Sequence, residues 1–273
     1  MVRALTRNKT TIAGLVLTAV LVVVAAFAPW LAPHDPYEQS IKNRIKPPSS
    51  TYPLGTDRLG RDVLSRIVYA SRISVGIGFG SALLGAVIGC LLGIFATFQG
   101  GLVEALMLKM IDVMMSFPTL ILCLLLLTVL GSGLISVMVA IGIAFAPRFA
   151  RLSRGPTLAL REIEFIEASR AIGASNLRIS VRHILPNVIG PVSVMMVLWM
   201  ATAIRIEATL SFLGFGVGPP IPSWGNMIQE GFRNLSHAPA LSLFPGLALL
   251  VAVLGFNLLG DGLRDIFDPR IRE

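Results

Sequence analysis

The sequence predicts an all-α integral membrane protein with about six transmembrane helices. Only 14% of its 273 residues are charged and 54% are hydrophobic, whereas a soluble domain carries about 25% charged residues. A helix needs about 20 mainly apolar residues to cross a hydrocarbon core about 30 Å thick, because each residue rises about 1.5 Å. Six apolar runs approach or exceed this length: 12–31, 74–97, 106–130, 134–150, 188–213 and 241–260.

The first run could instead be a cleavable signal peptide, because Arg3, Arg7 and Lys9 precede it and "AAFAP" ends it. The apolar region of a signal peptide is about 7–15 residues long, and this run approaches twenty. Proline directly after "AFA" also fits cleavage poorly. We therefore predict a retained anchor helix followed by an external loop, together covering residues 1–73.

The basic residues favour a cytoplasmic location for both ends of the chain. Six spans place both termini on one side, together with the 98–104 turn and the 148–187 stretch. That side has three basic residues near the N-terminus, seven arginines in the stretch and three in the C-terminal tail. The loops on the other side, 32–73 and 214–240, have eight, spread more thinly and mixed with acids. The positive-inside rule thus explains the net charge of +8 without a nucleic-acid partner.

The stretch "REIEFIEASRAIGASNLRISVRHILPNV", residues 161–188, is polar and arginine-rich between two apolar runs. Its apolar residues recur at helical spacing, Gly173 interrupts them, and Pro186 is expected to limit a second helix near the next span. We predict two short amphipathic helices at the membrane surface, joined at Gly173. The periodicity alone leaves open an ordinary loop whose arginines bind lipid phosphates.

Within this stretch, "EASRAIG" followed nine residues later by "HILP" resembles the EAA loop of bacterial ABC-importer permeases. Residues at five motif positions match: Glu167, Ala168, Gly173, Leu185 and Pro186. Two positions depart, since Ser169 replaces the second alanine and His183 stands where isoleucine is expected.

Four further stretches look like the second permease subunit of dipeptide, oligopeptide and nickel importers, a binding-protein-dependent transport system inner-membrane component. They are "PLGTDRLGRDVLSRIVYASRIS" (53–74), "DVMMSFPTLIL" (112–122), "LSFLGFGVGPPIPSWGNMI" (210–228) and "FPGLALLVAVLGFNLLGDGLRDIFDP" (244–269). The resemblance implies the type I ABC importer permease fold in a bacterial inner membrane. It makes 74–260 the permease core, with the EAA loop at 161–186, and 261–273 a cytoplasmic tail.

In such importers the EAA loop forms a coupling helix that docks on a cytoplasmic ATPase. The resemblance therefore implies four kinds of partner: a second permease in a heterodimer, two ATP-binding subunits, an extracytoplasmic binding protein and membrane lipid. The small residues Ala168, Ser169 and Gly173 would let the ATPase approach closely, and Glu167 could pair with one of its basic residues or cap the helix. The chain has no G-x-x-x-x-G-K-[ST] phosphate loop. We expect a non-enzymatic subunit that binds no cofactor, with ATP and Mg on partner subunits.

Gly85, Gly89 and Gly93 form a G-x-x-x-G-x-x-x-G line in the second run. Small residues four apart allow two membrane helices to approach closely. The neighbour is expected to be a helix of this subunit, and a helix of the second permease is the alternative.

Arg205 and Glu207 lie near the outer end of the fifth run, on different helix faces. Ionisable residues inside a span usually face a cavity or one another, so these two are either outer-gate or pathway residues or interfacial anchors. Lys109 and Asp112 are expected to form an i,i+3 pair at the inner end of the third run.

Two external segments remain. Residues 56–66, "TDRLGRDVLSR", are expected to form an interfacial helix, either a lipid-surface anchor or a contact for a binding protein. Residues 215–228 are rich in glycine and proline. This composition predicts either a structured external loop that could receive substrate or a re-entrant packing element, with Trp224 at interface depth.

Other function classes lack their usual signs. An ion-coupled secondary transporter, the alternative function, would need ionisable residues near mid-membrane and usually internal repeats; we see neither. H-E-x-x-H and G-x-S-x-G are absent, and three scattered histidines suggest neither an intramembrane enzyme nor a metal site. Peptides are the first expected substrates, followed by nickel and glutathione-like or other small conjugates.

Overall fold

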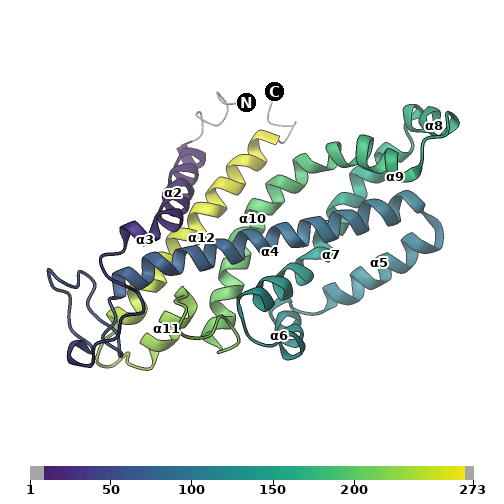
Figure 1. The fold of residues 1–273 in the computed structure, drawn as a ribbon. Helices are drawn as coiled ribbons and strands as arrows, with labels where there is room; N and C mark the ends of the chain where they lie inside the picture. Colours follow the sequence, from purple (N-terminus) through teal and green to yellow (C-terminus); the bar gives the residue numbers. More distant parts are fainter. Residues whose placement is uncertain (1–8, 268–273) are drawn as a thin grey trace.

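The computed structural model describes residues 9–267, which are almost entirely helical (Figure 1). The α-helices are α2 Lys9–Ala26, α3 Ala28–Leu31, α4 Val63–Gln99, α5 Gly101–Ser116, α6 Thr119–Leu130, α7 Leu134–Arg161, α8 Glu164–Ala171, α9 Asn176–Ile179, α10 Leu185–Phe212, α11 Trp224–Phe232 and α12 Ala240–Phe267. A 3₁₀ turn, η1, covers Ile41–Asn43, and a π-helical turn, η2, covers Ser180–Ile184.

Five helical segments are long and apolar enough to cross a membrane: Lys9–Ala26, Val63–Gln99, Leu134–Arg161, Asn176–Phe212 and Ala240–Ile266. Helices α5 and α6 meet the same test only as a pair, bent by 97° at their junction. Phe117 and Pro118 adopt extended backbone angles at this bend, because proline disfavours helical angles in the residue before it. Five of the six predicted spans are therefore present as long apolar helices, and the third is present only as this bent pair.

The predicted interfacial helix at 56–66 is wrong. Thr56 and Asp62 instead pair across a single antiparallel bridge, and α4 begins at Val63 and continues for 37 residues. The Asp62 carboxylate accepts a hydrogen bond of 2.9 Å from the backbone N–H of Ser65. Asp62 thus fixes the start of α4, since a carboxylate at the N-cap satisfies a backbone donor that has no partner within the helix.

The prediction that Pro186 limits the second helix of the 161–188 stretch is wrong. This helix continues past Pro186 into the span that ends at Phe212. A proline ring normally clashes with the carbonyl one turn before it. Here that turn is widened: the N–H of Leu185 donates to the carbonyl of Ser180, five residues back. The π-helical turn therefore accommodates the proline and keeps the helix continuous.

Helices α4 and α7 pack closely along the glycine line. A Cβ atom at Gly85 would collide with Phe145 and the carbonyl of Gly142, and one at Gly89 with Ala146 and Phe149. A Cβ atom at Gly93 would collide with Ala150 and Ser153. The three glycines thus face a helix of the same chain.

The molecule has two ends that differ in character. The start of α2, the end of α12 and α8 lie toward the top of Figure 1, whereas the 32–62 loop and α11 lie at the lower left. We call these the α8 side and the α11 side. The predicted topology separates the same segments in the same way.

Candidate functional site

The coupling-loop candidate consists of α8, the turn after it and α9. Gly173 has φ 86°, and two backbone hydrogen bonds close the helix end: Gly173 N–H to Arg170 O at 2.9 Å and Ala174 N–H to Ser169 O at 3.0 Å. This pair of bonds is the Schellman motif, which favours glycine because of its positive φ. No atom lies within 4 Å of where a Cβ of Gly173 would be. Backbone conformation, not space, therefore requires glycine at the predicted turn.

The structure places the predicted coupling residues in two groups. Glu167, Ala168 and Gly173 are exposed around the end of α8. Ser169 is buried, and its hydroxyl donates to the carbonyl of Phe165 at 2.9 Å. The remaining two lie at the start of α10, where Leu185 is half-buried and Pro186 is exposed.

Contacts that the sequence did not predict attach this loop to the end of α4. The Arg161 guanidinium donates to the carbonyl of Thr97 at 2.8 Å. That of Arg170 lies 4.6 Å from the centre of the Phe98 ring, within cation–π range. Ile166 is fully buried in the main core. These contacts limit how far α8 can move independently of α4.

His183, the main departure from the EAA pattern, has an aromatic partner. Its ring meets the Phe165 ring edge-on, with centroids 4.9 Å apart and planes at 86°. This T-shaped arrangement is favourable for aromatic pairs. Because Phe165 lies on α8 and His183 on η2, the pair links the two arms of the loop.

The loop also exposes large apolar side chains. The exposed members are Ile163, Phe165, Ile172, Leu177 and Val181, with Ile172 86% exposed. Apolar side chains gathered on an otherwise polar surface are typical of interaction sites. The loop therefore presents apolar side chains that this chain does not cover.

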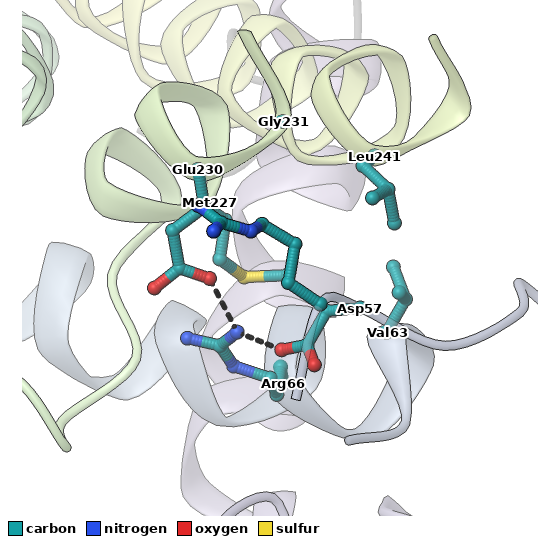
Figure 2. A pocket seen from close by; sticks show the side chains of 8 residues that line it. Asp57, Val63, Arg66, Met227, Glu230, Gly231 and Leu241 are labelled. Atoms are coloured by element: carbon teal, nitrogen blue, oxygen red, sulfur yellow. Dashed lines mark hydrogen bonds and ion pairs between the residues drawn. The ribbon is translucent and has the colours of Figure 1, made fainter. Parts of the chain in front are cut away.

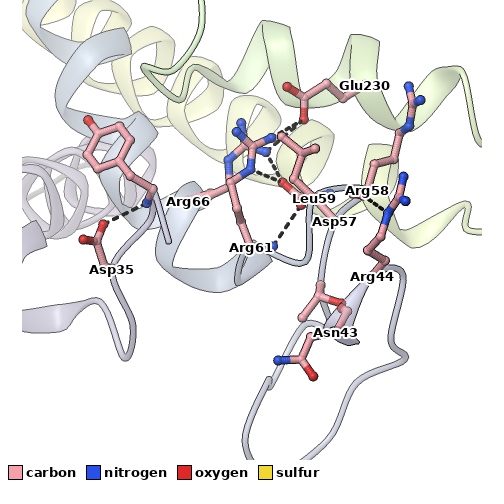
Figure 3. Close-up of polar contacts among 11 residues, drawn as sticks. Asp35, Asn43, Arg44, Asp57, Arg58, Leu59, Arg61, Arg66 and Glu230 are labelled. Carbon is pink, nitrogen blue, oxygen red and sulfur yellow. Dashed lines mark hydrogen bonds and ion pairs between the residues drawn. The ribbon is translucent and has the colours of Figure 1, made fainter. Parts of the chain in front are cut away.

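The α11 side contains a cluster of charges, which we call the ion cluster: Asp57, Arg61 and Arg66, which are buried, and Glu230, whose side chain is 33% exposed. Arg66 contacts Asp57, and it contacts Glu230 at 2.9 Å, as Figure 2 shows. Arg61 contacts the same two carboxylates at 2.7 and 3.0 Å (Figure 3). The exposed fractions of Asp57, Arg61 and Arg66 are 5%, 4% and 2%.

The charges of the ion cluster shift the acidity of Asp57. Burial by itself would raise the pKa of this carboxyl, but the guanidinium groups of Arg66 and Arg61 lower it. Hydrogen bonds from the backbone and side chain of Arg61 lower it further, and together these effects hold the pKa below its ordinary value. Asp57 is therefore stabilised as an anion.

The ion cluster joins the 53–66 segment to α11, and Trp224 strengthens the same junction. Its indole N–H donates to the carbonyl of Ile67 at 3.1 Å, and the side chain is only 1% exposed. Trp224, the first residue of α11, is thus buried against α4, and its position at interface depth stays a prediction. Helix α11 packs against α10 and α12.

Arg205 and Glu207 lie on different faces of α10, as predicted. Arg205 is exposed. Glu207 is 0% exposed and accepts hydrogen bonds from the hydroxyls of Ser211 at 2.8 Å and Ser74 at 3.2 Å. Glu207 thus connects α10 to α4, and Arg205 is not its partner.

The carboxylate of Asp112 contacts Arg151 on α7, so the expected Lys109–Asp112 pair is replaced by a contact between helices.

Cys90 and Cys123 are buried and unbridged. Within residues 9–267, no group of three His, Cys, Asp or Glu side chains could hold a metal ion.

Comparisons with known proteins agree with this architecture. Residues 75–273 match the family model described as "Binding-protein-dependent transport system inner membrane component". Residues 1–48 match the model of the "N-terminal TM domain of oligopeptide transport permease C".

Three relatives cover nearly all of the chain. The dipeptide transport system permease protein DppC of Alkalihalophilus pseudofirmus is 39% identical over 271 residues, which are 99% of this chain and 89% of the relative. The glutathione transport system permease protein GsiD of Pectobacterium atrosepticum is 39% identical over 272 residues, 99% and 90% of the two chains. GsiD of Escherichia coli is 42% identical over 253 residues, 92% and 84%.

A chain of the MetNI methionine ABC transporter, solved in inward-facing conformations, has the same fold. The TM-score is 0.55 at 22% identity, and the match covers 74% of this chain and 97% of the other. A second crystal form of that transporter matches with a TM-score of 0.54.

Proposed function

The chain belongs to the family of binding-protein-dependent transport system inner membrane components, and we propose that it is a permease subunit of an ATP-binding-cassette importer for peptides. The family match over residues 75–273 carries this proposal. Relatives named for dipeptide and glutathione transport support a peptide-like substrate. None of these findings favours an ion-coupled secondary transporter.

The proposed mechanism is alternating access driven from outside the chain. Moving a gate from 1:99 to 99:1 requires about 5.5 kcal/mol of differential binding, whereas one exposed ion pair offers about 1 kcal/mol at most. An ion pair at Glu167 is therefore too weak to drive transport. The energy comes from ATP-dependent closure of partner subunits, and α8 transmits it as a rigid element: Arg170 holds α8 to α4, and Arg161 holds the preceding end of α7 to the same part of α4.

This role assigns each side of the molecule to a compartment. The α8 side, with residues 161–186, the start of α2 and the end of α12, is cytoplasmic, in agreement with the positive-inside rule. The α11 side faces outward and receives substrate from an extracytoplasmic binding protein. The membrane is the bacterial inner membrane.

The complete importer contains this chain, a different second permease and two ATP-binding subunits. ATP and Mg bind to those subunits, because this sequence has no phosphate-binding loop. This chain itself binds no cofactor and performs no hydrolysis.

The proposal can be tested with the complete complex reconstituted in proteoliposomes, using Glu167→Gln and Gly173→Ala. Alanine in the backbone conformation of Gly173, with φ 86°, costs about 1–2 kcal/mol of conformational strain. If this strain raises the barrier to transport, the rate of uptake falls by about 5- to 30-fold. We expect peptide uptake and peptide-stimulated ATP hydrolysis to fall together in both variants. Glu164→Gln, which removes an exposed charge from the same helix, is the matched control.

Unchanged uptake and unchanged stimulated hydrolysis in both variants would show that the coupling assignment is wrong. Uptake driven by an ion gradient in vesicles without ATP would instead favour the secondary-transporter alternative.

A further inference from the structure

Three arginines lie along α7 at intervals of three residues: Arg148, Arg151 and Arg154. Two of them are neutralised by carboxylates on α5. Arg151 contacts Asp112, and Arg154 contacts Glu104 at 2.9 Å. These pairs attach α5 to α7, which lie side by side in Figure 1.

Arg148 differs from the other two because no carboxylate among residues 9–267 pairs with it. Its guanidinium donates to the hydroxyl of Thr119 at 2.8 Å and to the carbonyl of Ala144 at 3.2 Å. It also lies 4.9 Å from the centre of the Trp199 ring. All three partners are neutral, so the positive charge has no counter-ion.

The depth of Arg148 makes this lack of a counter-ion important. Arg148 lies about 21 Å along α7 from Leu134, the first residue of the helix. The apolar run 134–150 begins with Leu134, so a span that starts there places Arg148 in the inner part of a hydrocarbon core about 30 Å thick. Charged side chains at such a depth usually face a partner, a cavity or a pathway.

The surroundings of Arg148 suit an anionic ligand. A guanidinium has five N–H donors, and the two hydrogen bonds use one at each terminal nitrogen. The side chain is half-buried, so its remaining donors are not all enclosed by protein. Trp199 covers the guanidinium, and the fully buried Phe145 ring, its centroid 4.6 Å from that of Trp199, packs against the indole.

We propose that Arg148 binds the carboxylate of the transported peptide as the peptide passes through the membrane. This inference rests on the proposed function. A planar guanidinium matches a carboxylate through two parallel hydrogen bonds, and every unmodified peptide ends in a carboxylate. Trp199, which is half-buried, offers apolar surface to the neighbouring part of the peptide, and the fully buried Phe145 ring packs against it. Arg148 comes from α7 and Trp199 from α10, and Thr119 adds the start of α6.

The test compares two forms of one dipeptide, with a free C-terminal carboxylate and with a C-terminal amide, in proteoliposomes containing the complete complex. Uptake is divided by the occupancy of the binding protein, measured separately for each peptide. We expect Arg148→Gln to reduce uptake of the acid by about 10- to 100-fold, as loss of a charge-assisted hydrogen bond implies, with little effect on the amide. Arg148→Lys should give an uptake of the acid between those of the unmodified complex and Arg148→Gln. Lysine keeps the positive charge but cannot donate the two parallel hydrogen bonds of a guanidinium.

Arg151→Gln, which removes an arginine that already has a counter-ion, is the control and should leave the ratio of acid to amide uptake unchanged. Equal loss of both peptides in Arg148→Gln, or loss of neither, overturns the inference. If Arg148→Gln fails to assemble, Arg148→Lys decides: an unchanged ratio overturns the inference. No ATP-dependent uptake of either peptide by the unmodified complex overturns the peptide assignment and this inference together.

Discussion

The ion cluster and the coupling loop are both polar segments between apolar helices, but they are completed in opposite ways. In the ion cluster, Asp57, Arg61 and Arg66 are buried and satisfy one another together with Glu230. In the coupling loop, Glu167 is exposed and so is Ile172. Buried charges that find partners within the chain make a segment part of the fold. Exposed apolar and charged side chains mark a surface that another protein must complete.

The largest effect that can break this comparison is expected from Arg66→Leu. The substitution leaves the carboxylates of Asp57 and Glu230 with one guanidinium between them. Breaking a buried ion pair in this way costs about 3–5 kcal/mol. A large fall in the thermal unfolding midpoint of the purified chain in detergent is therefore expected.

Arg58→Leu is the matched control, because Arg58 follows Asp57 directly in the chain but is exposed. Exposed substitutions usually change stability by about 0.5 kcal/mol or less. Equal unfolding midpoints for Arg66→Leu and Arg58→Leu would mean that the ion cluster does not stabilise the fold.

The pH dependence of the ion cluster is the next effect. The pKa of Asp57 is lowered in the folded chain, so its stabilising contribution is fully present above the unfolded value of about 3.9. That contribution is lost as the pH falls through the folded pKa, because protonation removes the anion that the arginines bind. The unfolding midpoint should therefore fall in acid more steeply in the unmodified chain than in Asp57→Asn, measured between pH 7 and pH 3. Parallel curves for the two proteins would contradict this assignment.

The smallest effect on stability, and the sharpest contrast with the ion cluster, is expected from Ile172→Ser. This side chain is 86% exposed, so the free energy of unfolding should change by about 0.5 kcal/mol or less. If the proposed docking on the ATPase is right, the serine removes an apolar contact in the assembled importer, and peptide-stimulated ATP hydrolysis should fall. Ile172→Val keeps an apolar side chain and should retain hydrolysis. A loss of stability without a loss of hydrolysis would place Ile172 in the fold rather than in the interface.

Particular residues show how far the sequence could be interpreted. The six apolar runs were predicted because membrane thickness fixes their length. The turn at Gly173 was predicted because a helix end there favours glycine. The break in the third span had a local signal in Phe117–Pro118 that the hydropathy of the run concealed. The ion cluster had no such signal, since Arg66 and Glu230 are separated by 164 residues.

The sequence by itself determined the membrane class, the apolar runs and the position of the polar 161–188 stretch between two of them, because length, apolar content and short motifs are local properties. Tertiary structure alone decided that Arg61 and Arg66 are buried against Glu230, that His183 packs on Phe165 and that Arg148 has no counter-ion among residues 9–267. The physical reason is that the cost of a charge depends on which groups surround it. In this chain those groups come from helices far apart in the sequence.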